Sequence, residues 1–294
     1  MGYRIFYSLF YLISLLPMRV HYLFSDLLYP LLYYIIRYRR KVVRKNLTLS
    51  FPEKSRSEIL TIERRFYRFF CDYFVENVKA LTIGRENLMK RMTFDFDEPL
   101  MKVFRDKQLC FLYLGHFCNW ELIASLQWWV PEDVHCAQLY TKLHNDAMNR
   151  IFYTIRSHYG GENINKKDAL RRIVDIKKSG QKALIGFISD QAPKRENIHL
   201  WVDFLNQDTP VFTGTERIAK KMDAAVCYGH VSRLRRGYYH CMLTLIAENA
   251  NQYAEHDLTR QYMKMLEADI RQDPARWLWS HNRWKRQRTD VQQS

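Results

Sequence analysis

The stretch Leu109–Glu121, LCFLYLGHFCNWE, decides the fold. Its first six residues are all apolar or aromatic, which predicts a short buried strand. Gly115 breaks that strand, and Asn119 is a residue type that caps the N-terminus of a helix. His116 is therefore expected in a strand-to-helix turn at the carboxyl end of a strand, where open α/β sheets place their ligands.

Glu121 lies five residues after His116, about one turn into the predicted helix. From there its carboxylate can turn back and hold the imidazole, and a histidine oriented by a carboxylate is a general base for a hydroxyl or thiol. Asp190 and Glu216 are the alternatives for this role, because both can lie near the same end of the sheet. The short separation along the chain favours Glu121. The spacing also suits a buried turn histidine beside a glutamate that complements the helix dipole.

The composition limits the classes of partner. The chain has 294 residues and a net charge of +15, which suits nucleic acid, an anionic membrane, or an acidic protein or phosphorylated substrate. No zinc-finger, RNP or helix-turn-helix pattern is visible, so nucleic acid is the least favoured of these. The six cysteines include no C-x-x-C pair and are expected to be buried free thiols in a reducing compartment.

The N-terminal part is strongly apolar over residues 5–36, where Pro17 and Pro30 predict kinks. Its longest uncharged piece is shorter than the about 20 residues that a straight helix needs to cross a bilayer. The basic segment RYRRKVVRK follows at residues 37–45. Apolar helices beside a polybasic patch are typical of an anchor at an anionic cytoplasmic leaflet. A buried helical hairpin is the alternative.

Beyond this segment, strands and helices alternate. A capping box at Ser55 and Glu58 predicts the start of an aromatic-rich amphipathic helix. Strands are predicted at 135–140, 182–189, 226–232 and 238–248, and helices at 145–159, 167–179 and 257–271, with a further helix opening at 213–216. This order predicts an α/β fold with a mixed, mainly parallel sheet flanked by helices, and an antiparallel hairpin at one end of the sheet.

Three motifs resemble the lipid A late acyltransferases, the lauroyl/myristoyl branch of the lysophospholipid (glycerolipid) acyltransferase superfamily. GHFCNWE at 115–121 resembles the H-x4-D/E motif of that superfamily, although Cys118 stands where the branch usually has glycine. Asp190-Gln191 followed by WVDFLNQDTPVFTGT at 201–215 resembles the second motif. WLWSHNRWK at 277–285 is similar to the closing W-x-W-x-H-x-R-W-K block, whose tryptophans suit either a core or an interfacial belt.

The resemblance implies O-acyl transfer from a fatty acyl thioester, most specifically on acyl carrier protein, to a hydroxyl of a lipid A precursor. It implies no metal and no cofactor. His116 would remove the hydroxyl proton and later protonate the departing thiolate, while Glu121 would fix the imidazole tautomer. Basic residues would bind the acidic carrier protein and the phosphates of the acceptor.

Further residues are expected to contact substrate. Arg150 and Arg156 cannot both sit squarely on one helical face, and Arg156 is the candidate oxyanion contact. The N-terminus of the helix at 213–216 is either a phosphate site or ordinary threonine capping. The predicted substrate-binding residues are Asn119, Arg150, Arg156, Asp190, Gln191, Thr213, Gly214, Thr215 and Glu216.

We therefore expect residues 1–45 to form a membrane-associated segment and residues 46–294 an acyltransferase domain, at the cytoplasmic face of the inner membrane. One alternative is acylation of another lysolipid, such as a lysophospholipid or aminolipid. Another is a non-catalytic membrane lipid-binding protein, against which the intact His116 and Glu121 argue. A nucleic-acid binder would not need the apolar N-terminus.

Overall fold

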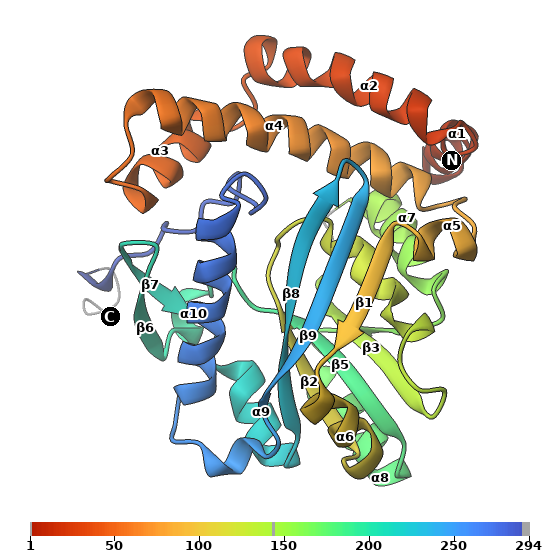
Figure 1. The fold of residues 1–294 in the computed structure, drawn as a ribbon, viewed down its shortest axis with the longest axis vertical. Helices are drawn as coiled ribbons and strands as arrows, with labels where there is room; N and C mark the ends of the chain where they lie inside the picture. The colour runs from red at the N-terminus through yellow and green to blue at the C-terminus, as the bar shows by residue number, and fades with distance from the viewer. Residues whose placement is uncertain (1, 143–144, 290–294) are drawn as a thin grey trace.

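A seven-stranded sheet with strand order β1-β9-β8-β2-β5-β3-β4 forms the centre of the computed structural model, which describes residues 2–142 and 145–289 (Figure 1). The strands are β1 (Met92–Phe96), β2 (Leu109–Leu114), β3 (Val134–Tyr140), β4 (Glu162–Asn165), β5 (Lys182–Ile188), β8 (Ala225–Arg235) and β9 (Tyr238–Ala247), and a separate hairpin holds β6 (Leu200–Phe204) and β7 (Gln207–Val211). All pairings in the large sheet are parallel except β8 with β9. The predicted α/β fold with a mainly parallel sheet is confirmed.

The expected position of the antiparallel hairpin is wrong in one respect. The hairpin β8–β9 does not end the sheet, because β1 pairs in parallel outside β9. The sequence pattern does not predict β1, because this strand is only five residues long and alternates between buried and more exposed positions. The pairing protects what would otherwise be an open sheet edge.

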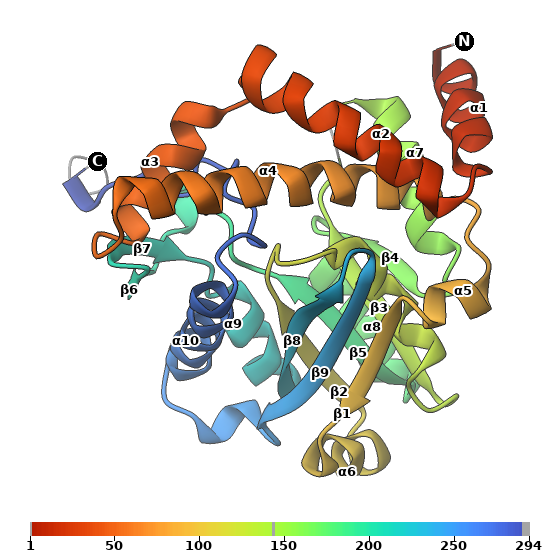
Figure 2. The same cartoon turned by 45° about the horizontal axis from the view of Figure 1, so that its top comes forward.

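Helices cover both faces of the sheet. The helices are α1 (Gly2–Ser14), α2 (Met18–Pro30), α3 (Arg40–Ser50), α4 (Arg56–Lys79), α5 (Arg85–Met89), α6 (Glu98–Asp106), α7 (Asp146–Ser157), α8 (Ala169–Ser179), α9 (Gly214–Met222) and α10 (Asp257–Gln272), with a π-turn η1 (Leu31–Ile35) and the 3-10 segments η2 (Trp120–Trp128), η3 (Arg195–Asn197) and η4 (Ala250–Gln252). Right-handed crossovers put η2 and α7 on one face and α8 and α9 on the other. The long helix α4 lies across the end of the sheet, and α2 packs on its outer side (Figures 1 and 2).

Local signals in the sequence account for several boundaries. Every residue of β2 is buried, as a strand covered on both faces requires. The predicted capping box is present, because the Ser55 side chain accepts from the Glu58 backbone N–H and the Glu58 carboxylate accepts from that of Ser55. Gly180 ends α8 at φ 75°, the left-handed conformation that glycine adopts without strain. All six cysteines are buried and free, as expected.

The prolines divide the N-terminal segment as predicted. Pro17 directly precedes α2, and Pro30 is its last residue before the π-turn. Within the described residues, none of the helices combines the length and apolarity needed to cross a bilayer. The predicted boundary between residues 1–45 and 46–294 falls inside α3. Residues 290–294 lie outside the described residues. The division of the chain into these two parts remains a prediction.

Candidate active site

His116 pairs with Asp190 at the carboxyl ends of two neighbouring strands. The Nδ1 atom of His116 lies 2.5 Å from Oδ1 of Asp190, and the His116 backbone N–H donates to Oδ2 at 2.9 Å. The parallel register of β2 with β5 sets Leu114 opposite Ile188. His116 and Asp190 each lie two residues beyond these strand ends, so they also face one another. The imidazole Nε2 is left for other partners, and the side-chain nitrogen of Gln191 lies 3.2 Å from it.

Asp190 is a buried carboxylate that stays ionised. Burial by itself raises its pKa, but the charge of His116 and the hydrogen bonds from His116 and Trp277 outweigh this effect and lower the pKa to about 2. Trp277 donates its Nε1–H to Oδ2 at 2.7 Å. A fixed negative charge at Nδ1 selects the tautomer with the proton on Nδ1 and stabilises the imidazolium. The ring is thereby prepared to accept a proton at Nε2.

The expectation that Glu121 orients His116 is wrong. Both carboxylate oxygens of Glu121 accept from Arg156, at 2.7 Å to Nε and 2.7 Å to Nη2. The planar guanidinium matches a carboxylate in this two-point geometry. Arg156, which lies 35 residues further along the chain, therefore binds Glu121 in the place where His116 was expected. Both residues line the same cavity as His116, so Glu121 holds Arg156 beside the histidine.

The turn that carries His116 is tightly enclosed. A Cβ atom on Gly115 would lie 2.5 Å from Cδ1 of Leu266 on α10, so glycine is needed for this close approach. Cys118 has φ 52°, a left-handed conformation that explains the glycine expected at this position. The Cys118 thiol is fully buried, and burial raises its pKa, which argues against a nucleophilic role.

Asn119 does not cap the following segment, which is a 3-10 helix rather than the predicted α-helix. Its side-chain amide instead donates to Glu76 of α4 at 2.8 Å, and both side chains are buried. Burial raises the pKa of Glu76. Two further donors reach the same carboxylate, the hydroxyls of Tyr239 at 2.8 Å and Tyr22 at 3.1 Å. Glu76 therefore connects the His116 turn to α2 and to the β8–β9 hairpin.

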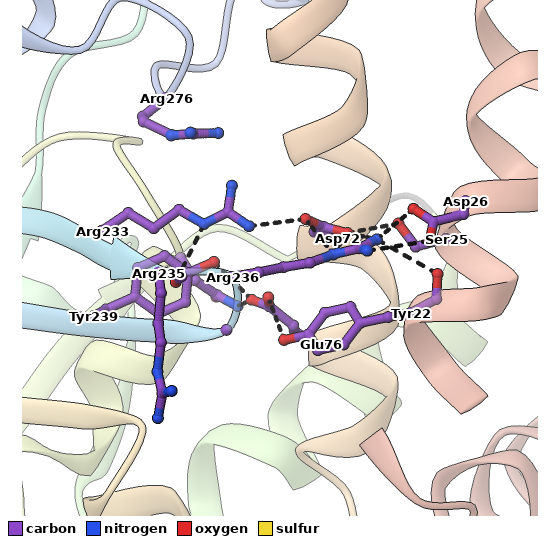
Figure 3. A network of polar contacts seen from close by, with 12 residues as sticks. Tyr22, Ser25, Asp26, Asp72, Glu76, Arg233, Arg235, Arg236, Tyr239 and Arg276 are labelled. Atoms are coloured by element: carbon purple, nitrogen blue, oxygen red, sulfur yellow. Dashed lines mark hydrogen bonds and ion pairs between the residues drawn. The ribbon is translucent and has the colours of Figure 1, made fainter. Parts of the chain in front are cut away.

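Asp72 extends this connection one turn earlier on α4 (Figure 3). It accepts from Ser25 of α2 at 2.7 Å and from two arginines of the hairpin, Arg233 at 3.0 Å and Arg236 at 2.6 Å. Arg236 also reaches Asp26 at 2.6 Å. The polar contacts drawn in Figure 3 thus join α2, α4 and the hairpin through the buried carboxylates of Asp72 and Glu76, with Asp26 and Arg236 at the exposed edge of the network.

A cavity of about 980 Å³ opens beside His116. On the η2 side its walls are mostly apolar, formed by Leu112, Leu114, Ile123, Leu126, Leu184 and Gly186, and the polar groups there include the Glu121–Arg156 pair and Gln138. Leu112 pairs opposite Gly186, so these strand residues share one face of the sheet. An apolar cavity of this size with a few convergent polar groups is typical of a ligand site.

The structure brings together some of the predicted substrate-binding residues and separates others. Those that line the cavity are Arg156, Gln191, Gly214 and Thr215, and those that do not are Asn119, Arg150, Asp190, Thr213 and Glu216. Asp190 lies behind His116, to which it is hydrogen-bonded. Arg150 is exposed on α7. Glu216 turns away and accepts from the backbone and hydroxyl of Thr259 at 2.9 and 2.6 Å, which fixes the start of α10. For Asn119, Arg150, Thr213 and Glu216, a direct place in the cavity is therefore not found.

The C-terminal block contributes residues whose roles the sequence did not indicate. Trp277 and Trp279 are buried in the core, and the segment around them pairs with the His116 turn through the backbone. The Nε2 atom of His281 accepts from the Ala192 N–H at 3.2 Å, directly after the Asp190 strand. Burial lowers the pKa of His281 to about 4, so it stays neutral at pH 7. The third sequence motif marked this block without indicating its contacts.

Comparison with known families agrees with this geometry. The family model described as bacterial lipid A biosynthesis acyltransferase matches residues 3–286, nearly the whole chain. The chain belongs to this family. The resemblance seen in the three motifs is thereby confirmed, and the protein is an acyltransferase that acts on lipid A. No curated protein matches at a significant level.

We predict that Glu76→Ala destabilises this acyltransferase strongly. The substitution leaves the buried amide of Asn119 and the hydroxyls of Tyr22 and Tyr239 without their acceptor. At about 1–3 kcal/mol for each of the three unsatisfied donors, the free energy of unfolding should fall by about 3–9 kcal/mol. Glu76→Gln retains a carbonyl acceptor and should cost about 1 kcal/mol.

Urea denaturation followed by circular dichroism measures both variants. Glu86→Ala is the control, because that glutamate is exposed and its carboxylate pairs with the exposed Lys90. An effect of Glu76→Ala no larger than that of the control would mean that the network does not stabilise the fold.

Proposed function

We propose that this acyltransferase moves a fatty acyl chain from a thioester on acyl carrier protein to a hydroxyl of a lipid A precursor, with His116 as the general base. The observation that carries the proposal is the His116–Asp190 pair at an apolar cavity, in a chain of the lipid A acyltransferase family. The acyl chain has an apolar space to enter, and the reacting carbonyl would then lie beside the imidazole.

The chemistry follows from the two ring nitrogens. Nε2 takes the proton of the acceptor hydroxyl as its oxygen bonds to the thioester carbon, which gives a tetrahedral oxyanion. The oxyanion collapses, the carbon–sulfur bond breaks, and the imidazolium returns the proton to the departing thiolate. Asp190 stays ionised throughout and stabilises the imidazolium. The products are the ester and the free thiol.

Arg156 is the proposed stabiliser of the oxyanion. Glu121 occupies its Nε and Nη2 groups, which leaves Nη1 for the substrate and fixes the plane of the guanidinium. A preorganised donor of this kind contributes a few kcal/mol, about 10²–10³ in rate. In this account Glu121 is a positioning residue for Arg156.

The test is acyl transfer by the purified protein, with acyl carrier protein thioester and a lipid A precursor in detergent, read by mass spectrometry of the lipid. The wild type should add one acyl chain, and His116→Ala should lower the rate by about 10²–10⁴. A lysophospholipid serves as the competing acceptor. Activity of His116→Ala within twofold of the wild type would remove the histidine from the mechanism.

We predict that Asp190→Asn lowers kcat by about 10²–10⁴, because a neutral amide neither stabilises imidazolium nor selects the Nδ1–H tautomer. Glu121→Gln retains one hydrogen bond to Arg156 and should change kcat by less than about tenfold. Steady-state kinetics on both variants, with thermal melting as the check on folding, separates the two carboxylates. The reverse order of severity would return the orienting role to Glu121.

We further propose that α1, α2 and η1 dock on the cytoplasmic face of the inner membrane. Large apolar side chains are exposed along these elements, namely Phe6, Leu9, Leu12, Leu15, Leu23, Phe24, Leu27, Leu31, Ile35 and Ile36. Exposed cations follow at Arg37, Lys41 and Lys45, whereas Arg40 and Arg44 are paired with buried Glu63. An apolar face flanked by cations suits an interfacial contact with anionic lipid.

We predict that Ile35→Glu weakens binding to phosphatidylglycerol-containing vesicles by about tenfold or more, since an exposed apolar residue that would insert becomes charged. Met242→Glu is the matched control, because Met242 is also exposed but lies on β9. Vesicle co-sedimentation at low and high salt measures both variants. Equal binding of the two variants would place the contact elsewhere.

A further inference from the structure

The cavity beside His116 continues onto the second face of the sheet. Ala137, Leu139 and Phe187 line it as well, and strand alternation puts them on the face opposite Leu112 and Gly186. The pairing of β3 with β5 ends at Gln138 and Gly186, so the cavity has a passage between the strand ends. We call the part that lies against α8 and α9 the basic arm.

Four cations line the basic arm: Lys166, Lys167, Arg217 and Lys221. On α9, Arg217 and Lys221 are one helical turn apart, on the face that also presents Gly214 and Ile218 to the cavity. None of the four cations forms an ion pair with a carboxylate in the part of the chain that the structure describes. By contrast, Lys220 on another face of α9 is engaged by Glu216 and two backbone carbonyls.

Glu162 lines the cavity on the same face of the sheet, but its carboxylate is already paired with Arg172 and His135 and not with Lys166. The ammonium of Lys166 lies 4.2 Å from the ring centroid of Phe212, and burial together with the charge of Lys194 lowers its pKa. Clustered cations repel one another unless an anion lies between them. A group with several anionic oxygens would contact lysine and arginine through charge-assisted hydrogen bonds.

We propose that the basic arm binds the phosphate of the pantetheine arm of the acyl donor, an inference that rests on the proposed function. A thioester bound at His116 carries two substituents, the acyl chain on the carbonyl carbon and the thiol substituent on the sulfur. These two substituents must extend in different directions. The acyl chain enters the apolar arm on the η2 face, which leaves the basic arm for the thiol substituent. In carrier-protein and coenzyme A thioesters, that substituent carries a phosphate at the end of an extended chain.

The position of α9 favours the donor over the acceptor as the source of the phosphate. In both Figure 1 and Figure 2, α4 lies between α9 and α2, the helix proposed to contact lipid. Helix α9 begins beside the cavity, which Gly214 and Thr215 line. From Gly214 to Lys221 the helix extends about 10 Å along its axis, away from this first turn. A soluble donor can therefore approach from a side that the membrane does not cover.

Binding is tested apart from catalysis, with two ligands that cannot transfer an acyl group: the S-dodecyl thioethers of 4′-phosphopantetheine and of pantetheine. The full-length wild type should bind the phosphorylated ligand at least about tenfold more tightly by calorimetry. Arg217→Ala/Lys221→Ala should abolish the difference in affinity between the two ligands and retain binding of the pantetheine thioether. Lys178→Ala/Lys264→Ala removes the same charge from exposed positions outside the cavity and should bind as the wild type does.

Kinetics with acyl carrier protein and coenzyme A donors gives the second readout. Arg217→Ala/Lys221→Ala should raise the donor KM at least about tenfold, with kcat and the acceptor KM within twofold. Equal wild-type affinity for the two thioethers would overturn the proposal, and so would a rise in the acceptor KM alone, which would assign the arm to lipid phosphates. Absence of transfer from any thioester by the wild type would refute the proposed function, while the calorimetric result still decides the phosphate site.

Discussion

The buried carboxylate of Asp190 is the charge on which the rest of the site depends. It is ionised although it is buried, because three N–H groups donate to it, from the ring and backbone of His116 and from Trp277. Those donors belong to the β2 turn and to the C-terminal segment, while Asp190 itself follows β5. A buried charge that loses its partners costs several kcal/mol, so the catalytic turn, the strand end and the C-terminal segment hold one another in place.

The network on α4 applies the same constraint further out. Asp72 and Glu76 are buried acids whose donors come from α2, the β8–β9 hairpin and the turn residue Asn119. Helix α2 is therefore part of the folded domain as well as the carrier of an exposed apolar face. Buried carboxylates that accept from several elements at once favour one arrangement of those elements. The placement of the exposed apolar face of α2 and that of the His116 turn thus depend on the same α4 carboxylates.

Much of this could be predicted from local sequence. A continuous apolar run ending in glycine identified β2 and the position of His116, and the capping box identified the start of α4. The orienting acid could not be predicted, because five residues of separation say nothing about which way Glu121 points. That direction depends on a 3-10 segment in place of an α-helix and on Arg156 from α7. The sequence offers Asp190 as one of two alternatives, and the β2–β5 register, which no local pattern encodes, places it opposite His116.

The position of His116 at the strand ends suits a reaction in which three groups need separate space. A thioester that reacts with a hydroxyl needs separate space for the acyl chain, the thiol substituent and the acceptor. At the carboxyl ends of parallel strands, both faces of the sheet and the solvent beyond them meet within a few residues. His116 lies at that point, next to the place where β3 and β5 stop pairing. The cavity thus extends from the imidazole in two directions, under η2 and along α9, and the residues that line it make the first mostly apolar and the second basic.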